Sequence, residues 1–293
     1  MTSPTGSRTA DVESAADQRG EMLERWDRAA PGWSRRADAI QDFGIRVSVW
    51  MVEHLGLQPG YTVLDLAAGP GDTGFLAAEL IKPGGTLITT DASRAMLGVA
   101  TGRARDLGVT NVEFKQLELE WIDLPTASVD AALCRWGLMF ALDPGAALQE
   151  CRRVIRPGGR IAVATWDVPE QNPWATIPTR ALVELGLVAP PDPDAPGMFS
   201  LADRERVRGL LEDAGFVEVV VESVDLARSE PSVDAYFEET LDLSSQFADA
   251  WQPLSKRHQD EVRERIGSLV APFTSADGSV ELPARSLVAT AAA

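Results

Sequence analysis

The sequence predicts an α/β fold built on a doubly wound, mostly parallel sheet. From residue 58 onward, short apolar segments alternate with helical segments of about 10–15 residues, a spacing that favours right-handed crossovers between parallel strands. Turns that contain glycine or proline separate these segments. The chain has 293 residues, of which 45% are hydrophobic, so it can bury the core of one large domain or of two smaller ones.

Each predicted strand is a short apolar run between turn residues. The predicted strands lie at 61–66, 86–90, 112–114, 129–134, 160–165, 216–224 and 279–291. The predicted helices lie at 72–81, 93–107, 144–155, 172–186 and 201–214, with mostly helical sequence across 233–270. Lys82-Pro83-Gly84-Gly85 ends the first of these helices, and Ser93 opens the second.

Two further helical patterns precede the sheet, between residues 21 and 57, and Ala30-Pro31-Gly32 predicts a turn between them. Residues 1–20 are rich in Ser, Thr, Gly and Asp and predict a flexible N-terminus. A proline-rich loop is predicted at 189–197, after the helix that follows the fifth strand.

The charge balance excludes some classes of partner. With 27 Lys and Arg against 44 Asp and Glu, the formal net charge is −17, which argues against nucleic-acid binding because phosphate contacts need clustered basic side chains. No run approaches the roughly 18 apolar residues of a membrane span. The first seven residues lack the pattern of a signal peptide, so we expect a cytoplasmic protein. Two cysteines, Cys134 and Cys151, predict neither a disulfide framework nor a metal site.

A glycine-rich turn joins the first strand to the first helix of the sheet. Gly69, Gly71 and Gly74 form the pattern G-x-G-x-x-G, in which the backbone can approach a ligand and the helix N-terminus offers free N–H groups. A tight strand–helix turn alone would explain the same glycines. Asp91, however, ends the next strand, twenty residues after Gly71, where a carboxylate can accept hydrogen bonds from two ribose hydroxyls. The pair predicts a cofactor that contains adenosine.

Four segments in order resemble a known family. They are Val63-Leu64-Asp65-Leu66-Ala67-Ala68-Gly69-Pro70-Gly71-Asp72, Asp91-Ala92-Ser93-Arg94-Ala95-Met96-Leu97, Cys134-Arg135-Trp136-Gly137-Leu138-Met139-Phe140 and the Arg-Pro-Gly-Gly turn at 156–159. Across about residues 22–167 the sequence resembles the class I S-adenosylmethionine-dependent methyltransferases, especially those of ubiquinone and menaquinone biosynthesis. The resemblance implies a Rossmann-like sheet of seven strands with an antiparallel last strand and helical lid additions. It also implies S-adenosyl-L-methionine as cofactor and S-adenosyl-L-homocysteine as product.

The resemblance divides the chain into functional segments. We expect a flexible N-terminus (1–20), an N-terminal helical cap (21–57), a cofactor-binding core (58–167), remaining core with a loop insertion (168–230), a helical lid (231–276) and a final strand (277–293). A solvated helix face is the alternative interpretation of the lid. If the lid closes over the acceptor, Tyr236, Phe237 and Trp251 are predicted to form its inner face.

The resemblance also assigns cofactor contacts. Ala67, Gly69 and Gly71 would line the methionine end, Asp91 would hold the ribose, Ala92 and Met96 would flank the adenine, and Glu118 and Leu119 would stand where the family has an Asp-Ala pair. Arg135 would meet the cofactor carboxylate or cap a strand. Met96 could instead belong to a helix core. Asp65 could instead be a carboxylate that accepts hydrogen bonds from local backbone N–H groups.

The remaining site residues are assigned by topology, since ligands of open α/β sheets bind at the carboxyl ends of the strands. Aromatic and apolar residues expected there together predict an apolar acceptor pocket, although each alone is better explained as core: Trp33, Trp136, Met139, Phe140 and Trp174. His54 and Asp167 are the candidate catalytic bases, and no metal ligands are predicted.

These observations predict a methyltransferase that acts on an oxygen or carbon atom of a small apolar metabolite, such as a phenol, a quinone-like ring or a polyketide-type compound of secondary metabolism. The acidic balance favours a neutral or cationic acceptor. We expect a monomer or homodimer, with no nucleic acid or membrane as partner. Three alternatives stay open: a cyclase or other non-methylating enzyme that keeps the cofactor as a structural group, an NAD-dependent oxidoreductase, and a non-catalytic binding module.

Overall fold

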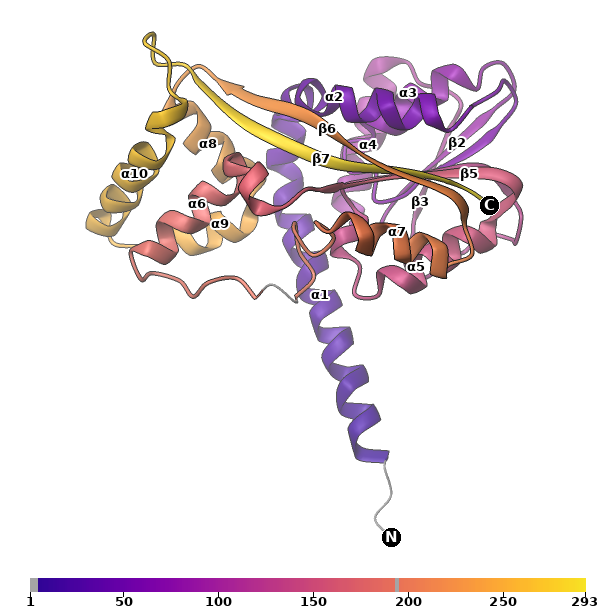
Figure 1. The fold of residues 1–293 in the computed structure, drawn as a ribbon, viewed down its shortest axis with the longest axis horizontal. Coiled ribbons are helices and arrows are strands. Elements are labelled where there is room, and N and C mark those ends of the chain that lie inside the picture. The colour runs from indigo at the N-terminus through magenta and orange to yellow at the C-terminus, as the bar shows by residue number, and fades with distance from the viewer. Residues whose placement is uncertain (1–4, 193–194) are drawn as a thin grey trace.

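A seven-stranded mixed sheet forms the centre of the computed structural model, which describes residues 5–192 and 195–293, with side chains from residue 16 onward. The strand order is β3-β2-β1-β4-β5-β7-β6 (Figure 1). The strands are β1 (Thr62–Asp65), β2 (Thr86–Asp91), β3 (Val112–Gln116), β4 (Val129–Arg135), β5 (Ile155–Trp166), β6 (Val217–Glu230) and β7 (Val280–Ala292). Strands β1 to β5 pair in parallel, while β7 lies antiparallel between β5 and β6. The predicted fold class and the antiparallel last strand are confirmed.

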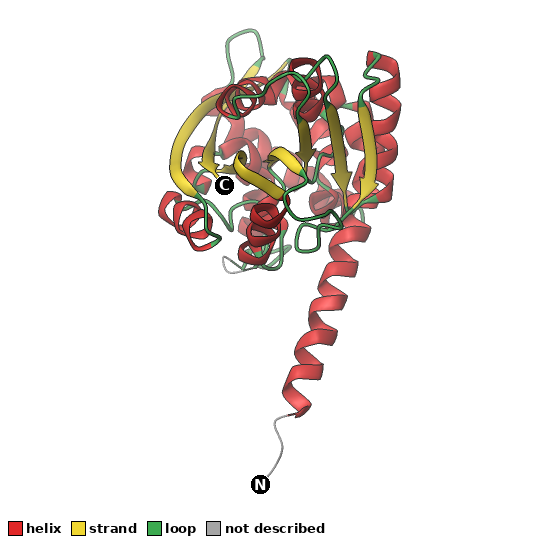
Figure 2. Ribbon diagram, turned by 90° about the vertical axis from the view of Figure 1, so that its right-hand side faces the viewer, coloured by secondary structure: helices red, strands yellow, loops and turns green. Residues whose placement is uncertain are grey.

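Helices cover both faces of the sheet. One face carries α2 (Ala37–His54), α3 (Asp72–Leu80) and α4 (Arg94–Leu107), and the other carries α5 (Pro144–Val154) and α7 (Arg204–Asp213) (Figures 1 and 2). Ser93 caps α4, since its hydroxyl accepts a hydrogen bond from the Met96 N–H at 3.0 Å. The main hydrophobic core lies between these helices and the sheet. None of the described helices is both long and apolar enough to cross a membrane.

A second, smaller core lies beyond the end of β5. Strand β5 ends its pairing where Trp166 faces Ser286, but β6 and β7 continue together to Glu230 and Val280. Helices α6 (Pro173–Glu184), α8 (Val233–Leu243), α9 (Ser245–Trp251) and α10 (Lys256–Val270) pack under this two-stranded extension (Figure 1). Of these, α8, α9 and α10 lie between β6 and β7 in the chain, where the sequence predicts a helical insertion.

The N-terminal region differs from the expectation. Helix α1 (Thr5–Arg35) runs through the turn predicted at Ala30-Pro31-Gly32. Residues 5–20 belong to this helix, residues 1–4 lie outside the described part, and the flexibility expected for residues 1–20 stays a prediction. The chain bends only at Arg36. Tertiary packing overrides the local turn signal here, because a side chain at Gly32 would collide with the Asp242 carbonyl of α8. The first turns of α1 extend away from the rest of the fold (Figure 2).

Candidate active site

The glycine-rich turn between β1 and α3 presents backbone to the carboxyl edge of the sheet. Ala67, Gly69 and Gly71 have φ angles of 48°, 54° and 91°, so the turn depends on residues that tolerate the left-handed region. Gly71 is the N-cap of α3. A Cβ at Gly69 would meet no other atom within 4 Å, so this side of the turn is open. An open turn at a helix N-terminus can accept a polar ligand on its backbone.

Asp91, at the end of β2, faces this turn. Its two carboxylate oxygens accept hydrogen bonds from the Gly69 N–H and the Ser93 N–H, each at 2.9 Å. Burial raises the pKa of Asp91 to about 6, and these backbone hydrogen bonds oppose the shift. A carboxylate offers about four lone-pair sites, so these backbone contacts leave room for a ligand hydroxyl.

A buried charge cluster lies beside the turn, at the carboxyl ends of β1 and β4. Asp72 forms ion pairs with Arg103 at 2.9 Å and with Arg135 at 3.2 Å, and the Arg135 side chain is only 8% exposed. Gly44 of α2 makes room for this guanidinium, since a Cβ there would collide with it. Within the described residues, neither Asp65 Oδ2 nor Arg135 Nη1 has a hydrogen-bond partner, although both atoms are buried. Burial raises the pKa of Asp65 well above its usual value and lowers the pKa of Arg135. The cluster thus offers one unsatisfied acceptor and one unsatisfied donor.

The other predicted cofactor residues of the β2–α4 segment lie nearby. The Ala92 carbonyl accepts a hydrogen bond from Gln116 Nε2 at 2.8 Å. Met96 is 2% exposed and packs against Ala29 and Ala30 of α1. Its position fits the alternative that the sequence left open, a methionine in a helix core.

Glu118 and Leu119 follow β3. Glu118 forms an ion pair with Arg19 of α1 at 2.9 Å, and its side chain is 47% exposed. Leu119 packs partly buried against the main core. The contact with Arg19 places α1 over the segment where the resemblance puts the adenine.

Four aromatic rings, from Phe43, Trp136, Trp166 and Trp174, form an aromatic wall at the carboxyl ends of β4 and β5. Trp136 and Trp166 stack with their centroids 4.2 Å apart, and Trp174 meets Trp166 edge-on at 5.0 Å and Phe43 at 5.2 Å. Trp136 adopts a φ of 59° and donates a hydrogen bond from Nε1 to Ser286 Oγ at 3.0 Å. Two of the predicted acceptor residues, Trp136 and Trp174, therefore belong to one aromatic cluster, in which Trp166 is only 2% exposed.

The other predicted acceptor residues lie in a separate group under α1. Trp33 and Phe140 both contact Trp26 edge-on, with centroid distances of 5.7 and 5.2 Å. Trp33 donates from Nε1 to the Leu243 carbonyl at 3.1 Å, which ties α1 to α8. Met139 is 2% exposed and belongs to the main core.

Helix α1 connects the ligand edge of the sheet with α8. Ser93, two residues after Asp91, donates from Oγ to Asp27 Oδ1 of α1 at 2.5 Å. Arg36, at the end of α1, donates to Asp242 of α8 at 2.8 Å, and this hydrogen bond raises the pKa of Arg36. The helix thus contacts the segment that follows β2 and is also anchored to α8.

The two candidate bases lie in different places. His54 is exposed at the end of α2, stacked on Trp50 at 3.9 Å, and ten residues beyond Gly44, which is about 15 Å along the helix. The structure therefore does not bring His54 to the carboxyl edge, because α2 must end near the amino end of β1, which follows it directly. Asp167 directly follows β5 at the carboxyl edge, and its Oδ1 accepts a hydrogen bond from the Val168 N–H at 2.7 Å.

The sequence reasoning missed Asn172. This side chain is 0% exposed, and its amide donates to the carbonyls of Asp167, Val168 and Arg285 while its oxygen accepts from Trp174 Nε1 and the Arg285 N–H. It fixes both the Asp167 loop and the Trp174 ring to β7. The Asn-Pro pair at the start of the predicted helix was the available signal.

The residues predicted for the inner face of the lid pack within the second core. Phe237 and Trp251 meet at 4.7 Å in a cluster shared with α6. Tyr236 is fully buried, and its hydroxyl donates to the Trp174 carbonyl at 2.5 Å. Tyr236 therefore connects the second core to the aromatic wall.

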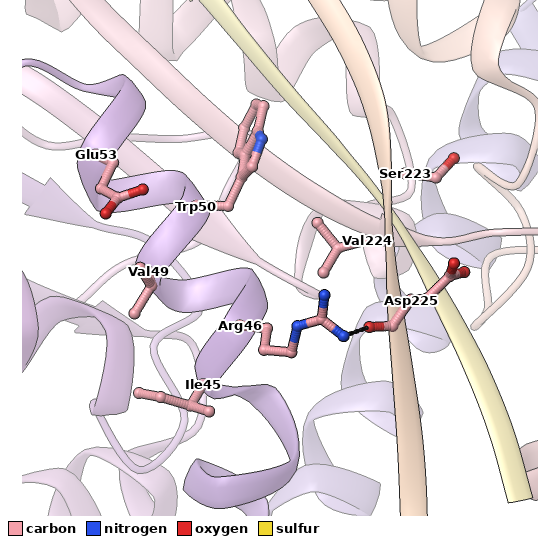
Figure 3. A pocket seen from close by; sticks show the side chains of 8 residues that line it. All are labelled: Ile45, Arg46, Val49, Trp50, Glu53, Ser223, Val224 and Asp225. Carbon is pink, nitrogen blue, oxygen red and sulfur yellow. Dashed lines mark hydrogen bonds between the residues drawn. The ribbon is translucent and has the colours of Figure 1, made fainter.

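A surface groove of about 510 Å³ lies elsewhere, between α2 and the edge strand β6 (Figure 3). Arg46 donates to the Asp225 carbonyl at 2.7 Å across it, and Trp50 donates to Glu222 at 3.0 Å. Because β6 is four strands from β1 in the sheet order, this groove is separate from the glycine-rich turn.

Comparisons with known proteins agree with this geometry. A family model described as a methyltransferase domain matches residues 57–187. The ubiquinone/menaquinone biosynthesis C-methyltransferase UbiE of Cellvibrio japonicus is 31% identical over 176 residues, which cover 57% of this chain and 71% of that protein. The YcgJ protein of Bacillus subtilis has a similar fold, with a TM-score of 0.55 and 18% identity over 84% of this chain and 97% of that one. The [4+2]-cyclase SpnF also shares the fold, with a TM-score of 0.51 and 17% identity over 84% of this chain and 80% of that one.

Proposed function

The chain belongs to the class I S-adenosylmethionine-dependent methyltransferases, and from this premise we propose that it methylates an oxygen or carbon atom of a small apolar acceptor. A phenol, a quinone-like ring or a polyketide-type metabolite fits this description. The aromatic wall beside the glycine-rich turn is the observation that carries the proposal for the acceptor. Membership of this family removes the NAD-dependent oxidoreductase and the binding module from the alternatives.

The residues around the turn fit the cofactor. We assign the ribose hydroxyls to Asp91, which keeps free lone pairs after its two backbone hydrogen bonds. Asp65 Oδ2 and Arg135 Nη1 are buried and unpartnered in the described chain, and they match the ammonium and carboxylate groups of the cofactor's amino-acid end. The open backbone at Gly69 gives the cofactor its close approach.

The protein's part in the reaction is alignment and exclusion of water. When bound, S-adenosylmethionine supplies an electrophilic methyl group on a positively charged sulfur. Rigid placement of the two reactants can lower the barrier by about 7–11 kcal/mol, so no dedicated catalytic motif is required. The aromatic wall gives the expected acceptor position an apolar border, and α1 contacts the β2–α4 segment beside the turn.

Asp167 is the residue we assign to proton removal when the acceptor atom carries a proton. It follows β5 at the edge where the acceptor is expected, and Asn172 holds its loop in place. His54 is too distant for this role, because it lies about 15 Å along α2 from the helix turn that meets Arg135 and Trp136.

The similar proteins support a choice of acceptor atom and acceptor class. UbiE is described as a C-methyltransferase of quinone biosynthesis, which supports carbon as the acceptor atom and a quinone-like ring as the acceptor. We also propose a cytoplasmic location, a monomeric or homodimeric state and a role in secondary metabolism.

Incubation with methyl-labelled S-adenosylmethionine and a panel of phenols, naphthols and reduced quinones tests the proposal. We expect label in an acceptor and one equivalent of S-adenosylhomocysteine per methylated product. Conversion of an acceptor without label transfer and without S-adenosylhomocysteine would instead support the non-methylating alternative.

A further inference from the structure

The extension of β6 and β7 carries a buried charge cluster that the proposed function does not use. We call Arg228, Glu230 and Glu239 the distal cluster. The Arg228 guanidinium lies 3.1 Å from Glu239 and 3.4 Å from Glu230, and the exposed fractions of the three side chains are between 7% and 10%. Two acids and one arginine taken out of water are costly to fold, so a site of this kind needs a reason.

The electrostatics of the distal cluster are unbalanced. Burial and the neighbouring Glu239 raise the pKa of Glu230 to about 7, while Arg228 opposes the shift. Arg36, between α1 and α2, is a further charge that interacts with both acids. Arg228 Nη2 is buried and lies 3.1 Å from Glu239 Oε1 in an ion pair, but its geometry leaves it without a well-aligned hydrogen bond within the described chain. Because this nitrogen carries two hydrogens, at least one N–H is available beside the pair, and a carboxyl near neutrality can either donate or accept.

The distal cluster is continuous with the aromatic wall. The Arg228 guanidinium lies 5.3 Å from the centroid of the Trp174 ring and 5.7 Å from that of Tyr236. Trp174 is the ring of the wall that faces the second core, and the Tyr236 hydroxyl holds its carbonyl.

The register of β6 and β7 gives the distance between the distal cluster and the Trp136 end of the aromatic wall. Val224 of β6 pairs with Ser286, the residue that holds Trp136, and Arg228 pairs with Leu282 on the same strands. Four residues of strand separate Val224 from Arg228, which is about 13 Å. Trp136 itself precedes Gly137, which packs against Ala67 of the glycine-rich turn.

We infer that the distal cluster binds the end of the acceptor farthest from the methylated atom, through a neutral oxygen function such as a hydroxyl or a carbonyl. The inference rests on the proposed function for the position of the methylated end. An anionic group would meet two acids, and a cationic group would compete with Arg228 for the Trp174 and Tyr236 rings. The acceptor is accordingly elongated, with an apolar middle that lies along the aromatic wall.

Two probes that differ only at the far end test the inference. In 4,4′-dihydroxybiphenyl both ends carry a hydroxyl, whereas 4-phenylphenol lacks the second one. Quenching of tryptophan fluorescence on protein saturated with S-adenosylhomocysteine reports the dissociation constant of each probe. We expect the diol to bind about tenfold more tightly, the effect of one hydrogen bond to a charged group.

Three variants locate the preference. Glu230→Gln and Glu239→Gln should reduce the ratio of the two dissociation constants to within about twofold. Glu281→Gln, an exposed residue of the same extension, should leave the tenfold ratio unchanged. Thermal unfolding of each variant separates a binding role from a structural one, and Glu239→Gln serves if Glu230→Gln does not fold.

Three results would overturn the inference. They are equal affinity of the wild-type protein for both probes, no quenching by either probe, and a tenfold ratio that persists in both glutamine variants. A failure to bind S-adenosylhomocysteine in calorimetry would count against the proposed function instead. The two ideas therefore fail in different measurements.

Discussion

The affinity for the cofactor product should depend on pH through Asp91. Its carboxylate faces the glycine-rich turn, and burial raises its pKa to about 6 in the free protein. Ribose hydroxyls donate to the ionised carboxylate, so binding favours that form and releases a proton near this pH. Acidification must therefore weaken binding.

The size of the effect follows from the titration. At about pH 5, one unit below the pKa, roughly one tenth of the Asp91 side chains are ionised in the free protein. The dissociation constant of S-adenosylhomocysteine should then be about tenfold larger at about pH 5 than at about pH 8. Asp91→Asn should bind more weakly by about 1–3 kcal/mol at high pH and should show little change with pH.

Calorimetry across this pH range, in two buffers of different ionisation enthalpy, measures both the affinity and the proton release. Glu222→Gln, an exposed acid on β6, is the matched control and should titrate like the wild type. Affinity that rises on acidification, or a slope that persists in Asp91→Asn, would show that Asp91 does not hold the ribose as a carboxylate. Asp65, whose pKa is also raised by burial, would then be the group to replace next.

Three further variants probe the site and its supports. Arg135→Met should weaken binding of S-adenosylhomocysteine about tenfold or more but leave 5′-methylthioadenosine, which lacks the amino-acid end, nearly unaffected in the same calorimeter; equal losses for both would contradict the assignment. Asn172→Ala removes five hydrogen bonds of a fully buried side chain and should lower the unfolding free energy by about 2–4 kcal/mol in urea titrations, so a loss below 1 kcal/mol would refute its anchoring role. Ser93→Ala removes the cap of α4 and the hydrogen bond to Asp27 and should cost about 1–2 kcal/mol by the same method, whereas Ser93→Thr should restore most of it.

Local signals in the sequence predicted the geometry of the glycine-rich turn and its contact with Asp91. The strand, the glycine turn and the helix of β1–α3 are adjacent in the chain, so the positive φ angles at Gly69 and Gly71 follow from residue type alone. Asp91 and Ser93 lie in one short segment, and the structure joins Asp91 to Gly69 as the spacing implies. The predicted sheet follows from the alternation of strands and helices, which needs no side-chain detail.

Features that depend on distant contacts were not predictable in the same way. Helix α1 passes through Pro31 because Gly32 and Trp33 pack on α8, more than 200 residues later. The predicted sixth strand ends at residue 224, so the inward-facing Arg228 and Glu230 were not recognised as neighbours of the aromatic wall. The position of His54 could have been predicted. Because only a short connection joins α2 to β1, the end of α2 must lie near the amino end of that strand, away from the ligand edge.

The measurement that tests the central claim most directly is methyl transfer itself. Wild-type protein, labelled S-adenosylmethionine and 4,4′-dihydroxybiphenyl or a reduced naphthoquinone are incubated together, with Asp91→Asn as the matched variant. The account predicts a labelled acceptor and an equal amount of S-adenosylhomocysteine with the wild type, and strongly reduced turnover with the variant at low cofactor concentration. An acceptor consumed without label, or equal turnover by both proteins at that concentration, would contradict it.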